Sequence, residues 1–353
     1  MRVMVTGKIL IRCDANVVIG TGHVMRCLAL AQSWQETGGR VSFLLGAGGK
    51  EVQDRLSSEG VEVLTLAVAI GSHEDAEETA RVAERGEATW LVLDGYDFSS
   101  AYRQIVRRRS ASLLLLDDGG ICAPYDCDVL LNFAPDASAL YRDRKADVQY
   151  LLGPEFALVR REFLAAKLNR AETPAVARRV LVSFGGSDPN NVTLRVIGAL
   201  RQVARAELEV RVVVGSSNPH LALLENAVKE FPCSLDLLTD VRNMPELMAW
   251  ADLGVSAGGG TCYEMAFMNV PMFLITIASN HDLTVQSLYK RKAAIGPGWF
   301  HVVTQHELAR SLANVIGNQV LRQELVDNSS RLVDGFGAHR VVEVLRTREP
   351  LNK

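Results

Sequence analysis

Short apolar runs alternate with helix-like segments along the whole chain. In the first half these runs are KILIR, RVSFLLG, VEVLTLA, TWLVLDG and SLLLLDD, and the segments between them carry apolar residues at helical spacing. The runs are apolar continuously rather than alternately, which is typical of parallel strands buried on both faces. A strand–helix–strand series of this kind predicts an α/β protein built on doubly wound parallel sheet.

The same pattern restarts after a polar, charge-rich stretch that contains Pro174. The segment RRVLVSFGGSDPNNVTLRVIGAL repeats the opening order of strand, glycine-bearing loop and helix, and the runs EVRVVVG, LDLLT, DLGVSAGGG and VPMFLITIA continue it. We therefore expect two Rossmann-like domains with a cleft between them. The expected divisions are an N-terminal domain over 1–165, a linker over 166–178, a C-terminal domain over 179–335 and, over 336–353, a terminal helix placed against the N-terminal domain.

Composition and charge narrow the functional classes. The 353 residues carry a formal net charge of −3 with scattered basic residues, which argues against nucleic acid as a partner. The six cysteines show neither a C-x-x-C pair nor zinc spacing, and no secretory leader pattern opens the sequence. We therefore expect a cytoplasmic protein with reduced thiols. The apolar runs are too short to span a bilayer, and nothing in the pattern points to membrane insertion or to a particular oligomeric state.

The segment SAGGGTCYEMAFMNVP places three glycines between a buried strand and a helix. Gly258, Gly259 and Gly260 would let the backbone approach a ligand, and the helix N-terminus presents N–H groups with partial positive charge. This arrangement predicts a phosphate site, and Glu264 lies one turn further on, within reach of the hydroxyls of an attached ribose. The alternative is that the glycines only allow close packing of the helix on the sheet. No Walker A lysine is present, so ATP hydrolysis is not expected.

A second glycine loop, SFGGSDPNN, opens the C-terminal domain. Gly185 and Gly186 are candidates to line the same diphosphate, with Ser187 donating a hydrogen bond. Asp188 is expected to be the N-cap of the following helix, with Pro189 at its first position. A plain strand-to-helix turn is an equally good interpretation of this loop by itself. Both loops, however, follow strands of one domain, at the carboxyl ends where such sheets bind ligands.

The stretch CDANVVIGTGHVMRCLALA joins the first strand to the first helix. Gly20 and Gly22 form a G-x-G, but Met25 stands where a dinucleotide-binding fingerprint has its third glycine, so that fingerprint is disfavoured. The helix dipole disfavours an imidazolium at His23 and leaves a neutral imidazole to act as a base. Asp14 is a candidate to orient His23 or to bind substrate. The alternative is that His23 caps the helix and Asp14 shapes the turn.

Asp117 and Asp118 follow the SLLLL run and would suit a metal-binding pair. Acidic residues at strand ends commonly line clefts or cap loops, and no histidine or third acid supports a metal here. We therefore expect no metal and no other cofactor.

Five segments together carry a resemblance to a known family: IRCDANVVIGTGHVMRCLALA, LLLLDDGG with YDCDVLLNFAP, LLGPEFALVRREF, VSFGGSDPNNVT and VSAGGGTCYEMAFMNVPMFLITIASN. They resemble, in the same order from about Lys8 to at least Leu288, the UDP-2,4-diacetamido-2,4,6-trideoxy-β-L-altropyranose hydrolases of pseudaminic acid biosynthesis. The resemblance implies the GT-B fold of the lipid II synthase MurG, an active site between two Rossmann-like domains, and a reaction that needs no metal.

The resemblance also implies roles for individual residues. UDP would lie against the C-terminal domain, with Gly258, Gly259, Gly260 and Thr261 near the diphosphate and Glu264 on the ribose. His23 would activate a water that attacks the anomeric carbon with inversion and releases UDP, and we expect Asp14 and Tyr96 to assist it. On the sugar side we expect contacts from Gly20, Gly22, Arg26, Asn280 and His281.

Two positions depart from the family pattern. The usual D-H-Y is Asp94-Gly95-Tyr96 in this chain, and the usual A-D-N-Q is Ala278-Ser279-Asn280-His281. Tyr96 and Asn280 match the family, whereas Gly95 and His281 do not. Both departures fall where the sugar would lie, so the resemblance predicts UDP recognition and leaves the exact sugar open.

Two other functional classes compete with a UDP-sugar hydrolase. A GT-B glycosyltransferase would use the same UDP pocket to pass the sugar to an acceptor, and it would need an acceptor surface that the sequence does not reveal. A non-catalytic binding protein would not need His23 in its motif. The expected partners are in each case a UDP-sugar and UDP.

Overall fold

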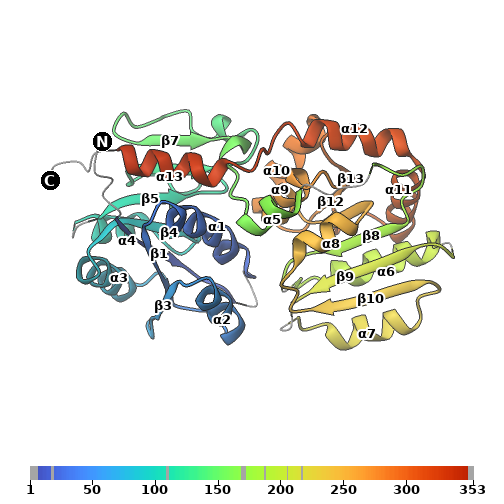
Figure 1. The fold of residues 1–353 in the computed structure, drawn as a ribbon, viewed down its shortest axis with the longest axis horizontal. Coiled ribbons are helices and arrows are strands. Elements are labelled where there is room, and N and C mark those ends of the chain that lie inside the picture. Colours follow the sequence, from blue (N-terminus) through green and yellow to red (C-terminus); the bar gives the residue numbers. More distant parts are fainter. Residues whose placement is uncertain are drawn as a thin grey trace. The chain divides into compact units, whose positions relative to one another are not determined.

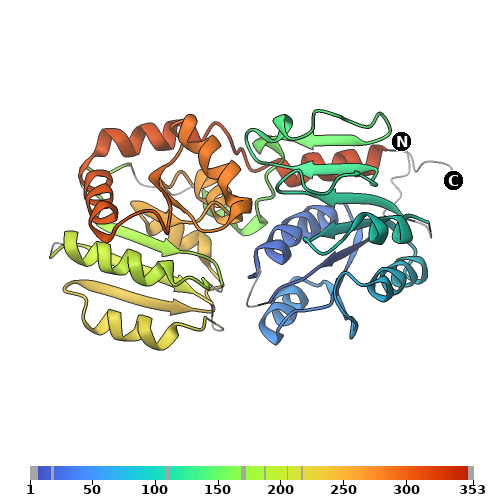
Figure 2. The ribbon, with the colours of Figure 1, turned by 180° about the vertical axis from the view of Figure 1, so that it is seen from behind.

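The computed structural model of the chain describes residues 7–16, 20–108, 111–167, 172–186, 188–204, 206–215 and 218–348. The chain forms two compact units. Unit 1 comprises Met1–Arg161 and Phe336–Lys353, and unit 2 comprises Glu162–Gly335. Each unit is a parallel sheet with helices packed on it, as Figure 1 and, from behind, Figure 2 show.

Unit 1 contains a seven-stranded parallel sheet in its described residues, in the order β3-β2-β1-β4-β5-β6-β7. Its strands are β1 (Lys8–Cys13), β2 (Arg40–Leu45), β3 (Glu62–Thr65), β4 (Ala88–Asp94), β5 (Ser112–Leu116), β6 (Val129–Asn132) and β7 (Gln149–Leu152). Its helices are α1 (Gly22–Glu36), α2 (Lys50–Ser58), α3 (His73–Arg85), α4 (Ser100–Arg107) and α13 (Gly337–Thr347), with short 3₁₀ turns η1 (Ala137–Ala139) and η2 (Pro154–Phe156). The strand order reverses between β1 and β4, which makes the carboxyl ends of these two strands the place for a ligand.

Unit 2 contains a six-stranded parallel sheet in its described residues, in the order β10-β9-β8-β11-β12-β13. Its strands are β8 (Arg179–Ser183), β9 (Glu209–Val214), β10 (Ser234–Thr239), β11 (Leu253–Ser256), β12 (Met272–Thr276) and β13 (Ile295–Trp299). Its helices are α6 (Val192–Val203), α7 (Leu221–Lys229), α8 (Met244–Trp250), α9 (Gly260–Phe267), α10 (Ser279–Lys290), α11 (Gln305–Gly317) and α12 (Gln319–Ser329), and α5 (Arg161–Ala166) begins at the boundary of the units. Here the order reverses between β8 and β11, which carry the two glycine loops.

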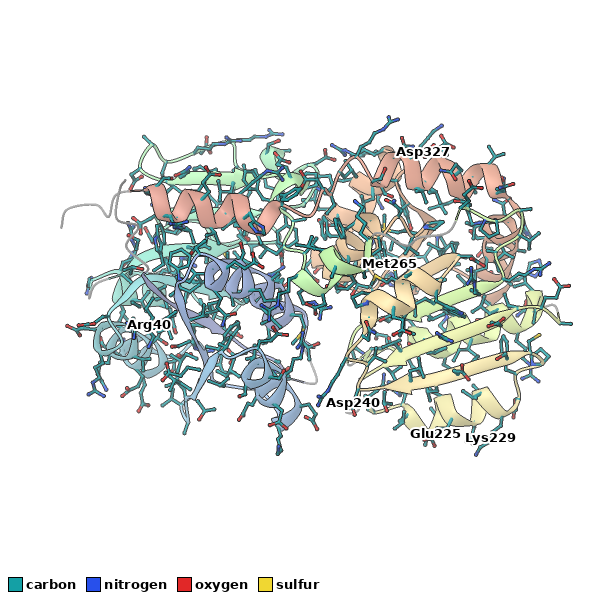
Figure 3. The ribbon with its side chains drawn as sticks, in the orientation of Figure 1. Arg40, Glu225, Lys229, Asp240, Met265 and Asp327 are labelled. Atoms are coloured by element: carbon teal, nitrogen blue, oxygen red, sulfur yellow. The ribbon has the colours of Figure 1, made fainter. Side chains whose placement is uncertain are left out.

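The apolar runs form the sheets because most of them are buried on both faces. The four leucines of β5, for example, are at most 3% exposed. The run VEVLTLA differs, since it becomes the edge strand β3, and both Glu62 and Thr65 are exposed. Met265 on α9, labelled in Figure 3, is fully buried and packs against Gly254 of β11.

The last helix returns to unit 1 after the chain has completed unit 2. Helix α13 packs against α1, and Trp90 of β4 donates its indole N–H to the carbonyl of Leu345 at 3.0 Å. The first residue of this helix, Gly337, has to be a glycine, because a Cβ there would lie 2.2 Å from the carbonyl oxygen of Ala157. No helix in the described ranges has the length and apolar character needed to cross a membrane.

The start of α6 differs from the sequence expectation. The N-cap is Asn191, in the left-handed conformation with φ 49°, and the helix begins at Val192 rather than at Pro189. Asp188 has a φ of 38°, so the chain turns before the helix can begin. Its carboxylate nevertheless accepts hydrogen bonds from the backbone N–H groups of Val192 at 3.0 Å and Thr193 at 2.8 Å. Placing the N-cap at Asp188 was therefore wrong, although its side chain does satisfy the start of the helix.

Candidate functional site

The candidate site of unit 1 lies at the carboxyl ends of β1, β4 and β5, which are neighbours in the sheet. His23 is in the first turn of α1 and is 7% exposed. The loop that precedes it turns at Gly20, whose φ is 69° and whose N–H donates to the carbonyl of Asn16 at 2.8 Å. Gly22, the first residue of α1, has open space on the side where a Cβ would be. The predicted base therefore sits at the strand-order reversal, beside an open stretch of backbone.

His23 meets Tyr96, which follows β4. The ring centroids are 5.0 Å apart and the rings are inclined by 69°, an edge-to-face contact. Tyr96 is 44% exposed, and its hydroxyl donates to Oδ2 of Asp118 at 3.0 Å. Nδ1 of His23 is buried and has no hydrogen-bond partner in the part of the chain that the structure describes.

Arg26, one turn further along α1, links two carboxylates. Its Nε and Nη2 donate to Asp94 at 2.7 and 2.6 Å, and its Nη1 and Nη2 donate to Asp118 at 2.7 and 3.0 Å. These bonds use all but one of the N–H donors of the guanidinium. The predicted contact of Arg26 with the sugar is thus limited to a single N–H, and its main partners are the ends of β4 and β5.

The ion pair controls the charge of Asp118. Burial would raise the pKa of this carboxyl, but the positive charge of Arg26 and its hydrogen bonds, with smaller contributions from His23 and Tyr96, lower the pKa to about 2. Burial and the negative charge of Asp118 together raise the pKa of the Tyr96 hydroxyl. At neutral pH the cluster therefore contains an anionic Asp118 and an un-ionised Tyr96.

Asp14, the residue after β1, accepts hydrogen bonds from the backbone and from an arginine. Its Oδ1 accepts the backbone N–H groups of Gly46 and Ala47, both at 2.7 Å, and its Oδ2 accepts from Nη1 of Arg12 at 2.7 Å. Arg12 is fully buried and also binds Asp75 through Nε and Nη2 at 3.1 and 2.8 Å. With these partners Asp14 ties the end of β1 to the loop after β2.

Asp117 also holds a loop. It is 2% exposed and accepts hydrogen bonds from the hydroxyl of Tyr141 at 3.0 Å and from the backbone N–H groups of Gly119 and Ile121 at 3.3 Å. Asp117 and Asp118 thus have separate partners. Within the described ranges, no three histidine, cysteine or acidic side chains are grouped as a metal site would require.

Gly95 lies against a buried aromatic side chain. A Cβ at this position would lie 2.9 Å from Cε2 of Phe98. Phe98 is 3% exposed, and its ring packs between the guanidinium of Arg12, 5.1 Å from the centroid, and the ring of Tyr102, 4.9 Å away. A side chain at position 95 would therefore displace a residue of the buried Arg12 network.

Gly95→His is expected to lower the free energy of unfolding by about 1–3 kcal/mol, because the extra side chain overpacks the site of Phe98. Chemical denaturation of the full chain measures this. Gly317→His is the matched control, since the space around Gly317 is open. An unchanged stability of Gly95→His would show that Phe98 moves aside without cost.

In unit 2 the loops after β8, β11 and β12 lie side by side, because these strands are neighbours. A Cβ at Gly258 would lie 2.4 Å from Cγ2 of Val285, so this glycine is required for packing on α10. Gly259 lies against the imidazole of His281, with 3.4 Å between its Cβ position and Nε2, whereas Gly260 is exposed and open. The packing interpretation therefore fits Gly258, and the ligand interpretation fits Gly260.

The helix N-termini of unit 2 differ in how their N–H groups are satisfied. Those of α6 are capped by the side chains of Asp188 and Asn191. Those of α9 and α10 have no side-chain cap. An anion is therefore favoured at α9 and α10, where Thr261 and Asn280 lie, rather than at α6.

The remaining predicted residues are placed as follows. Glu264 is one turn into α9 and partly exposed. Gly185 has a φ of 83° and open space around it, and the carbonyl of Gly186 lies against Gly215. Ser187 lies outside the described residues.

A comparison with known families finds a match within the second unit. Residues 180–328 match the model of the glycosyltransferase family 28 C-terminal domain. This stretch covers both glycine loops and the starts of α9 and α10.

Curated relatives and solved structures extend over more of the chain. It is 25% identical to the UDP-2,4-diacetamido-2,4,6-trideoxy-beta-L-altropyranose hydrolase of Campylobacter jejuni over 80% of this chain and 97% of that protein. It is 27% identical to the spore coat polysaccharide biosynthesis protein SpsG of Bacillus subtilis over 55% of this chain and 57% of that protein. The chain spans about half the length of several curated relatives that it matches. MurG of Acinetobacter baumannii matches 97% of this chain and 100% of its own with a TM-score of 0.67 and 15% identity, which confirms the predicted GT-B fold.

Proposed function

We propose that this chain, a relative of the UDP-2,4-diacetamido-2,4,6-trideoxy-β-L-altropyranose hydrolases, hydrolyses that UDP-sugar or a close relative of it in pseudaminic acid biosynthesis. The observation that carries the proposal is the position of His23. It lies in the first turn of α1, at the strand-order reversal of a Rossmann-like sheet and against Tyr96. In unit 2, the N-termini of α9 and α10, which have no side-chain cap, are the proposed site for the diphosphate.

The proposed reaction is a displacement at the anomeric carbon with inversion. His23 takes a proton from water, and the water oxygen forms a bond to the anomeric carbon on the face opposite the diphosphate. The bond between that carbon and the diphosphate oxygen breaks, and UDP leaves with the electron pair. The N–H groups at the starts of α9 and α10 stabilise the charge that develops on the diphosphate, so the proposal assigns no step to a metal.

UDP release without an acceptor tests the proposal. We expect the chain to release UDP and free sugar from the UDP-linked diacetamido-trideoxy-altrose, with the inverted anomer seen first by NMR, and at an unchanged rate in EDTA. Release only in the presence of an acceptor would instead identify a glycosyltransferase, which the family 28 domain also suits. Binding without turnover would identify a binding protein.

A further inference from the structure

We propose that Asp118 is a positioning residue, which fixes the hydroxyl proton of Tyr96 so that Tyr96 faces the reacting water only as a hydrogen-bond acceptor. The inference rests on the proposed function and adds a residue to it. Three observations on the Asp94–Arg26–Asp118–Tyr96 cluster carry it: the direction of one hydrogen bond, the anchoring of its acceptor, and the contact between Tyr96 and His23.

The direction of the Tyr96–Asp118 hydrogen bond follows from the chemistry of its acceptor. Both oxygens of Asp118 receive N–H groups of Arg26, and Oδ2 also receives the Tyr96 hydroxyl. An ionised carboxylate has no proton to donate. The pKa of Asp118, lowered to about 2, keeps it ionised across the neutral range. The proton of the hydrogen bond therefore comes from Tyr96, and the tyrosine oxygen presents only lone pairs to a bound molecule.

The acceptor is held in place from two other elements. Arg26, on α1, is bound by both oxygens of Asp94, which is fully buried at the end of β4. The same guanidinium binds both oxygens of Asp118, after β5. Two paired hydrogen bonds of this kind define both distance and orientation. The position of Asp118 is thus set by the framework of unit 1 and not by Tyr96 itself.

The contact between Tyr96 and His23 connects this hydrogen bond to the proposed reaction. A water between His23 and Tyr96 has two protons, one for the imidazole nitrogen that acts as the base and one for the tyrosine oxygen. Its lone pair then remains available to form the new bond to carbon. A tyrosine whose hydroxyl turned freely would instead donate to that lone pair and oppose the attack. Asp118 excludes this orientation.

A double-mutant cycle tests the inference, because a residue that acts through Tyr96 has no effect once the tyrosine hydroxyl is gone. We expect Asp118→Asn and Tyr96→Phe each to lower kcat about tenfold with little change in KM. The double variant should lose less than about twofold beyond Tyr96→Phe. Asp126→Asn is the control: Asp126 pairs with Ser100 and Lys145, away from Tyr96, and should leave kcat unchanged.

The results that would contradict the inference differ from the one that would refute the proposed function. If Asp118→Asn lowers kcat by the same factor in the presence and absence of the Tyr96 hydroxyl, Asp118 acts only on the structure and the inference is overturned. A wild-type kcat for Asp118→Asn overturns it as well. If this variant unfolds, Asp118→Glu, which keeps the charge opposite Arg26 but shifts the carboxylate, replaces it in the same cycle. A wild-type chain that releases no UDP from any UDP-sugar refutes the proposed function, and the inference with it.

Discussion

His23→Ala should lower the turnover of the UDP-sugar by about two orders of magnitude or more, while UDP affinity stays near the wild-type value. The imidazole is the proposed acceptor of the proton from water, so its removal acts on the transition state. UDP is expected to be held by unit 2, where the uncapped starts of α9 and α10 lie. The measurements are kcat by UDP release and the dissociation constant of UDP by calorimetry.

The matched control removes a different histidine that also lies at the start of a helix. His73 is the first residue of α3 in unit 1, as His23 is the second residue of α1, but His73 is exposed. His73→Ala should leave both kcat and UDP affinity unchanged. Because His23 is buried, the thermal stability of His23→Ala is measured alongside. Normal turnover by a folded His23→Ala would show that another group is the base.

The sequence predicts the elements that contain long apolar runs, because such runs are stable only when buried. KILIR, TWLVLDG and SLLLLDD are the central strands β1, β4 and β5. The alternation did not reveal β6 and β7, which are four residues each, nor β13, whose sequence IGPGW contains two glycines and a proline. In these strands the pairing with a neighbour, and not the local pattern, determines the conformation.

The candidate site likewise combines residues that short sequence motifs reveal with contacts between residues that are far apart in the sequence. The sequence shows His23 at the turn between β1 and α1. It also shows Tyr96 after β4, the strand beside β1 at the point where the strand order reverses. The ion pairs of Arg26 join residues 68 and 92 positions apart, so only the folded sheet brings them together. The side chain of Asp14 likewise finds its partners at Gly46 and Ala47, after a different strand. The sequence pattern therefore indicates the candidate residues, and the tertiary contacts show which carboxylates lie beside them.

The glycine loops of unit 2 look equivalent in the sequence and differ in the structure. Helix α6 satisfies its own first N–H groups with Asp188 and Asn191, so an anion there would have to displace a bound carboxylate. Helix α9 has no such cap, and Gly260 at its first position is exposed with open space around it. A carboxylate introduced at Gly260 would therefore imitate, at α9, the capping that Asp188 already provides at α6.

Gly260→Asp should weaken UDP binding by about 30-fold or more relative to Gly260→Asn, because a carboxylate near the start of α9 repels the diphosphate across a few ångströms. Asparagine has the same size and shape without the charge, so the comparison isolates electrostatics from steric hindrance. The fold should tolerate both variants, since nothing lies within 4 Å of the Cβ position. Calorimetric titration with UDP at low and high salt measures the effect, and the difference between the variants should shrink as salt screens it. Equal UDP affinities for the two variants at low salt would place the diphosphate away from α9 and contradict the assignment of this helix.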